Sequence, residues 1–214
     1  MNPSQSHSRL TGDVVARWHY DVDLFGEPYP TRHPVPDHFR TGAVTASELM
    51  GLTPEQGLAA VAAHELGHAV PWLACGLRVR RISIVPDGRL GGHAMALPTG
   101  VDDEIRWQAV GVASGERAED RWLREAGLWS PDRAAVTEMS ACQDRAWLME
   151  HTTPRPTFGS GDGLDFTVLH DMADSVLDQV WGRLTAALPV LVRQRVMSGE
   201  ELAECTGLPF PSRR

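Results

Sequence analysis

Residues 53–76 read TPEQGLAAVAAHELGHAVPWLACG. Thr53 supplies an N-cap hydroxyl, Pro54 suits the first helical position, and Gln56 stands where a capping box needs a Gln or Glu. This stretch therefore predicts a helix that opens at Thr53. Pro71 must kink or end that helix, because proline removes a backbone hydrogen bond.

The middle of this helix carries the run HELGH, residues 64–68. Histidines four apart lie on one helix face, so His64 and His68 can aim at a single ion. Glu65 falls to the side of that pair, where it can act as general base on a water that Zn²⁺ has acidified. The alternative is two solvent-facing histidines beside a helix-favouring glutamate. The small Ala and Gly neighbours leave room at this face and favour one zinc ion.

Catalytic zinc sites normally have three protein ligands, so another element must supply the third. Acidic residues of the downstream segments are the candidates: Glu116, Glu119, Asp120, Asp132, Glu138 and Asp144. Spacing does not choose among them. Glu116 and Glu119 are also candidates to accept a hydrogen bond from the second ring nitrogen of a histidine ligand.

The bulk composition excludes several classes of protein. With 214 residues, 42% of them hydrophobic, the chain can bury a core. A net charge of -8 gives no positive electrostatic field to attract a phosphate backbone, so nucleic acid is not an expected partner. The three cysteines form no Cys-x-x-Cys pair, which indicates reduced thiols and a cytoplasmic protein. The apolar residues 58–77 include two His, a Glu and a Pro, so no membrane anchor is expected.

The pattern along the chain indicates an α+β fold that is mainly α-helical. Residues 1–42 form a polar tail and a Pro-rich arm, and residues 43–214 form the main domain. Strands are expected at residues 80–85 and 93–97, separated by the turn Pro86-Asp87-Gly88. Helical patterns follow at residues 102–126, from 130 onward, and at 165–197. The expected architecture is a zincin-like HExxH helix with a small β element, followed by a helical bundle.

Three short runs after residue 63 together match the pattern of one known protein family. They are HELGHA at 64–69, RISIVPDG at 81–88 and GGHAMALP at 91–98. This block resembles the peptidase domain of the FtsH family of membrane-anchored, ATP-dependent zinc proteases. Weaker likeness continues at SGERAED (114–120) and at MSGEEL (197–202), so that it covers about residues 53–208.

The resemblance implies site residues beyond the HExxH run. In that family the third zinc ligand is an aspartate near the start of a following helix, and the counterpart here is Asp132 in Ser130-Pro131-Asp132. The strand after the zinc helix lines the family's substrate cleft. That likeness makes Ile82, Ile84, Gly92 and His93 the expected cleft residues, with residues 80–85 as an edge strand that pairs with a peptide. A plain core strand is the alternative.

The chain lacks a Gly-x-x-x-x-Gly-Lys-Ser/Thr phosphate loop, so the family's ATP-driven unfolding of substrates is not expected for this chain. The expected function is a stand-alone, ATP-independent zinc metallopeptidase that acts on short peptides or unfolded proteins. Two alternatives stay open: a zinc-dependent hydrolase or cyclase that tailors a small molecule or modified peptide, and a non-catalytic metal-binding interaction protein. The sequence leaves the oligomeric state and the substrate open.

Overall fold

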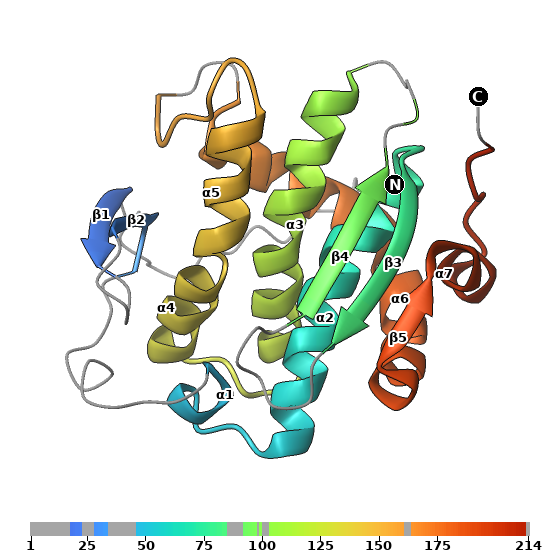
Figure 1. Cartoon of the computed structure of the whole chain (residues 1–214). Coiled ribbons are helices and arrows are strands. Elements are labelled where there is room, and N and C mark those ends of the chain that lie inside the picture. Colours follow the sequence, from blue (N-terminus) through green and yellow to red (C-terminus); the bar gives the residue numbers. More distant parts are fainter. Residues whose placement is uncertain are drawn as a thin grey trace, which may run out of the picture.

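The computed structural model describes residues 18–22, 28–33, 46–84, 92–97, 99, 103–160 and 164–212. Helices predominate and two small antiparallel sheets accompany them (Figure 1), which confirms a mainly helical α+β fold. Within these residues, no helix combines the length and the apolar character needed to cross a membrane. The predicted turn at residues 86–88 lies outside the described part of the chain.

Helix α2 (Pro54–Ala74) is the centre of the fold. It begins as predicted: Thr53 Oγ1 accepts a hydrogen bond from the Gln56 amide at 3.2 Å, and Gln56 Oε1 accepts one from the Thr53 amide at 3.0 Å. Pro71 does not end the helix, which continues for three more residues. All residues from Ala62 to Leu73 are buried, so this helix is surrounded by the rest of the protein.

The three-stranded sheet lies against α2 and has the order β4-β3-β5. Strand β3 (Arg78–Ile84) pairs antiparallel with β4 (Gly92–Leu97) on one side and with β5 (Val196–Ser198) on the other. The prediction of β3 as a free edge strand is therefore wrong. Strand β4 is the edge beside α2, and its described residues pair with β3 alone.

Long helices complete the core on the other sides of α2. Helix α3 (Glu104–Glu125) and helix α6 (Phe166–Gln194) both pack against α2 and against each other. Leu66, Leu73 and Leu184 are fully buried among them, which explains the regular apolar spacing of these segments. The C-terminal helix α7 (Gly199–Thr206) follows β5 directly.

A second layer lies beside α3 and contains the helices α4 (Pro131–Ser140) and α5 (Cys142–His151). The short helix α1 (Ala46–Leu49) and a hairpin of β1 (His19–Val22) with β2 (Pro28–Thr31) pack near α4 (Figure 1). Tyr29 of the hairpin is buried in a small apolar cluster with residues of α3 and α4. The N-terminal arm is thus joined to the domain through packed side chains.

Candidate metal centre

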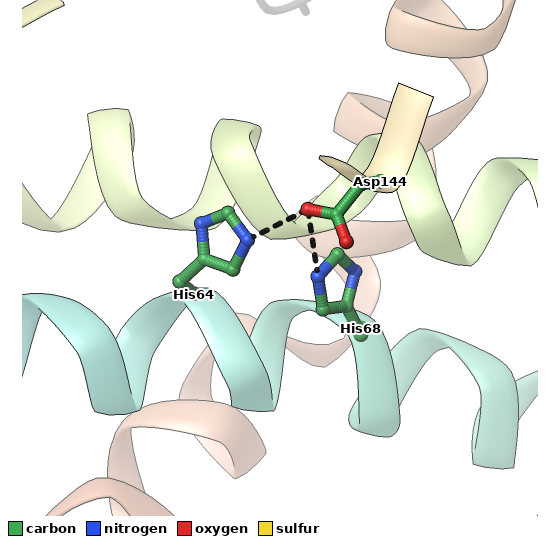
Figure 2. A group of neighbouring side chains, drawn as sticks. All are labelled: His64, His68 and Asp144. Atoms are coloured by element: carbon green, nitrogen blue, oxygen red, sulfur yellow. Dashed lines mark hydrogen bonds and ion pairs between the residues drawn. The ribbon is translucent and has the colours of Figure 1, made fainter. Parts of the chain in front are cut away.

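Helices α2 and α5 bring His64, His68 and Asp144 together (Figure 2). Asp144 Oδ2 lies 3.1 Å from His64 Nε2 and 3.4 Å from His68 Nε2. The two imidazoles, four residues apart on α2, have their ring centroids 4.8 Å apart. One nitrogen or oxygen atom from each of the three side chains lies within 4.8 Å of the others. The three side chains therefore converge on one point.

The outer nitrogen of each histidine has a hydrogen-bond partner. His68 Nδ1 lies 2.9 Å from the carbonyl oxygen of Gly111, which can only accept, so Nδ1 carries the proton. His64 lies between two carboxylates, with Nδ1 2.9 Å from Glu119 Oε2 and Nε2 3.1 Å from Asp144 Oδ2, so a metal at Nε2 would leave Nδ1 to donate to Glu119. With both Nδ1 atoms protonated, both Nε2 lone pairs face the Asp144 carboxylate. Three electron-pair donors that converge in this way require protons or a cation between them.

This donor set fits zinc. Two imidazole nitrogens and one carboxylate oxygen are typical ligands of a catalytic zinc ion, whose tetrahedral bonds place neighbouring ligand atoms about 3.3 Å apart. The distances from Asp144 Oδ2 to the Nε2 atoms of His64 and His68 match this separation between ligand atoms. The Asp144 side chain is 32% exposed, so the group is open to solvent on one side. A fourth position can thus be reached by water or substrate.

Electrostatics also favours a positive charge among these side chains. Burial lowers the pKa of His64, but hydrogen bonds to Asp144 and Glu119 outweigh it and raise the pKa well above its usual value. Burial likewise lowers the pKa of His68, and the charge of Asp144 outweighs it. The surrounding carboxylates therefore stabilise a cation at this point.

Glu65 lies beside this group and is 6% exposed. Burial raises the pKa of Glu65 to about 7, against the opposing influence of His68 and His64. A general base is most effective when its pKa lies near the working pH. A Cβ at Gly92 would lie 2.4 Å from Glu65 Cγ, so the first residue of β4 must be glycine for the strand to pass this closely.

Small residues of α3 let this helix approach the histidine face of α2. A Cβ on Gly115 would lie 2.2 Å from His68 Cε1, and one on Gly111 would lie 2.1 Å from Trp72 Nε1. The Trp72 ring in turn stacks on His68 with centroids 5.5 Å apart. The position of the His68 imidazole therefore depends on the absence of a side chain at Gly115.

The change Gly115→Ala is expected to weaken zinc binding about 10- to 100-fold, because the new methyl group must displace the His68 imidazole. It should also cost about 1–3 kcal/mol of unfolding free energy through overpacking. Chelator competition and thermal unfolding would measure both quantities. Gly182→Ala is the matched control, since nothing lies within 4 Å of a Cβ on this exposed glycine of α6. Unchanged zinc affinity in Gly115→Ala would contradict this role.

The structure does not bring Asp132 to the histidines. Asp132 is exposed in the first turn of α4 and lies in a groove with residues of α1. Asp144, another of the acidic candidates, is the third residue of α5 and lies in its first turn. The expectation that Asp132 lies with the histidines is therefore corrected: helix α5, which carries Asp144, and not α4 reaches this face of α2.

The other expected site residues divide into two groups. Ile82 and Ile84 are 0% and 3% exposed and belong to the apolar core, so they do not line an open cleft. Gly92 contacts Glu65 and His93 is exposed, and both lie on the edge strand β4.

Of the two glutamates considered as partners of the histidines, Glu119 forms a hydrogen bond with His64. Glu116 pairs instead with Arg145 and His170.

Two features of the site were missed at the sequence level. Gly111 and Gly115 stand four apart inside a helical pattern, where glycine is unfavourable, and this spacing is a signal of close helix approach. The break between α4 and α5 at Ala141 has no such signal, because neither Pro nor Gly is near it. That break places Asp144 in a first helical turn.

Comparison with known proteins gives partial similarities. The chain is 30% identical over 130 residues, 55% of its length, to the ATP-dependent zinc metalloprotease FtsH 2 of Alkaliphilus metalliredigens. It is 49% identical over 47 residues, 21% of its length, to the ATP-dependent zinc metalloprotease FtsH of Lactococcus lactis. These matches span 19% and 6% of the relatives' own lengths. No family model matches the chain. The similarities indicate a relation to the FtsH peptidase family, whose two matched members are zinc metalloproteases.

Proposed function

We propose that this chain is a zinc metallopeptidase in which His64, His68 and Asp144 hold the metal and Glu65 is the general base. One observation carries the proposal: the three converging donor atoms lie beside a buried glutamate, and that glutamate contacts the first residue of an edge strand. The partial similarity to FtsH proteases supports the same activity.

The edge strand β4 is the proposed site for the substrate backbone. Its described residues pair with β3 on one side, so an extended peptide can add to the other side through main-chain hydrogen bonds. His93 and Met95 alternate outward along β4 and are exposed. A peptide bound in this way runs past Gly92 and therefore past Glu65.

The chemistry follows from the position of these groups. His64, His68 and Asp144 would hold a zinc ion, which would supply a Lewis acid for a peptide carbonyl and for a water molecule. Glu65 would accept a proton from the attacking water, because burial raises the pKa of this carboxyl and makes it a stronger base than an exposed glutamate. Glu65 then donates that proton to the leaving amine. Glu119 and the Gly111 carbonyl hold the two imidazoles in their orientation.

The proposed substrates are short or unfolded peptides, cleaved without ATP. Strand addition requires an extended backbone, which a folded domain does not offer without prior unfolding. The net charge of -8 further favours neutral or basic peptides over acidic ones.

Incubation of the zinc-loaded protein with a peptide library, followed by mass spectrometry, tests the proposal. New termini that appear with zinc and disappear after chelation are expected. The matched control is the Glu65→Gln protein under the same conditions. If no peptide is cleaved while a panel of small molecules or modified peptides is converted, the chain is a tailoring enzyme instead. Conversion of neither, with zinc bound, would indicate a metal-binding interaction protein.

A further inference from the structure

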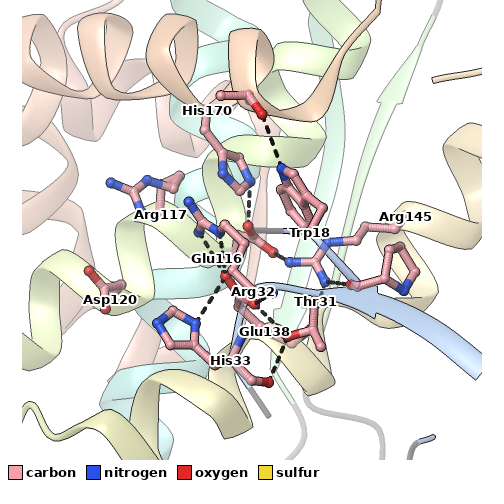
Figure 3. Close-up of polar contacts among 12 residues, drawn as sticks. Trp18, Thr31, Arg32, His33, Glu116, Arg117, Asp120, Glu138, Arg145 and His170 are labelled. Carbon is pink, nitrogen blue, oxygen red and sulfur yellow. Dashed lines mark hydrogen bonds and ion pairs between the residues drawn. The ribbon is translucent and has the colours of Figure 1, made fainter. Parts of the chain in front are cut away.

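We propose that Arg145 is a positioning residue, which holds Asp144 at the metal centre, and that the N-terminal hairpin β1–β2 supports Arg145 in this role. The inference rests on the metal centre proposed above. It concerns a buried polar cluster between the hairpin and helices α3 to α6, drawn in Figure 3.

Helix α5, which carries Asp144, has few other contacts that fix its orientation. Of its ten residues, Arg145 and Leu148 are the buried ones. It also begins without a side-chain cap, because Ala141 precedes it. Leu148 and the partly buried Cys142 are its apolar anchors, so the buried contacts of Arg145 contribute strongly to where the neighbouring carboxylate lies.

The guanidinium of Arg145 joins α5 to three other elements. Nη1 donates to the Pro30 carbonyl of β2 at 2.6 Å and to the Glu138 carbonyl of α4 at 3.1 Å. Nη2 pairs with the buried Glu116 carboxylate of α3. Arg145 is 1% exposed, so these partners replace the water around Nη1 and Nη2. Any movement of Arg145 would leave Glu116 buried without its cation.

Aromatic rings enclose the same guanidinium. Its carbon lies 5.3 Å from the ring centroid of Trp18 and 5.8 Å from that of Phe166. The Trp18 indole donates to Thr167 Oγ1 at 3.0 Å, which ties the arm to the start of α6. Trp18 thus packs over the Arg145 guanidinium and binds α6.

Glu138 fastens strand β2 to this cluster. Its carboxylate accepts hydrogen bonds from Thr31 Oγ1 at 2.6 Å, the Arg32 amide at 2.7 Å and Arg32 Nε at 2.8 Å. These bonds place the Pro30 carbonyl, one residue before Thr31, against Arg145. The hairpin therefore supplies one of the acceptors of the Arg145 guanidinium.

Arg145 and Asp144 are consecutive, so their side chains leave α5 about 100° apart. One points into the cluster, and the other points to the histidines of α2 (Figures 2 and 3). Because both belong to one rigid turn, the contacts that fix Arg145 also fix the Asp144 carboxylate. Arm and metal centre are coupled through this turn.

The test compares the zinc affinity of full-length variants by chelator competition. Arg145→Met is expected to bind zinc about 10- to 100-fold more weakly, the usual effect of removing a residue that orients a ligand. Arg145→Lys should weaken zinc binding less than Arg145→Met does, since a single ammonium can still pair with Glu116. Arg117→Met is the matched control: it removes the bidentate pair with Asp174 that joins α3 to α6, and should leave zinc affinity within about twofold.

Amide hydrogen exchange of the metal-free protein gives an independent readout. Arg145→Met and Trp18→Ala should raise exchange in α5 while α7 stays unchanged. If Arg145→Met does not fold, Trp18→Ala takes its place, and its zinc affinity and α5 exchange are compared with those of Arg117→Met. Zinc affinity and α5 exchange equal to those of Arg117→Met would overturn the inference and leave the metal centre intact. Failure of the wild-type protein to bind zinc would instead remove the proposed function, while the exchange data would still show whether Arg145 holds α5.

Discussion

Peptide hydrolysis by the Glu65→Gln protein is expected to fall about 10²- to 10⁴-fold, while one zinc ion stays bound. Glutamine has nearly the same shape as glutamate but cannot accept the proton of the attacking water. The metal should be retained, because the converging ligand group consists of His64, His68 and Asp144. The measurements are kcat/KM on a peptide that the wild-type protein cleaves, and zinc content after gel filtration.

Glu55→Gln is the control for this change. Glu55 is an exposed acid in the first turn of the same helix, so this variant tests the loss of a carboxylate from α2 away from the site. Its activity should equal that of the wild-type protein. Full activity in Glu65→Gln would show that Glu65 is not the general base, whether or not zinc stays bound.

The second large effect is expected from Asp144→Asn, which should weaken zinc binding more than about 100-fold. Loss of an orienting partner alone costs about 10- to 100-fold in metal affinity, and the loss of a charged ligand costs more. Asparagine keeps the volume of the side chain and removes its charge, so the histidines would face an amide. Chelator competition on the purified proteins measures the effect.

Asp132→Asn is the matched control, because Asp132 is likewise an aspartate in the first turn of a helix, α4. This exposed side chain should affect zinc affinity by less than about twofold and unfolding free energy by less than about 1 kcal/mol, through its interaction with the helix dipole. The opposite pattern, with zinc lost from Asp132→Asn and retained in Asp144→Asn, would restore Asp132 as the third ligand.

The local parts of the site could be predicted from sequence. The cap at Thr53 and the Pro at position 54 define α2, and the four-residue spacing of His64 and His68 then follows from helix geometry alone. The cap at Ser130 places the start of α4 in the same way. These features need only residues near one another in the chain.

The distant parts could not be predicted. Strand β5 has three residues, too few for a periodic pattern, and it forms because Arg195 takes a left-handed conformation (φ 68°) that ends α6 and turns the chain back to β3. The choice of Asp144 over Asp132 depends on how α4 and α5 pack, which no local signal encodes. Arg145 reads as an ordinary helix charge until Glu116, 29 residues earlier, is placed beside it.

The proposed zinc site needs one ion bound by His64, His68 and Asp144. A crystal of the zinc-loaded protein, measured on both sides of the zinc absorption edge, would locate that ion. We expect a single anomalous peak about 2.0–2.2 Å from the Nε2 atoms of His64 and His68 and from an oxygen of Asp144. A peak that Asp144 does not contact, or no peak between the two histidines, would contradict it.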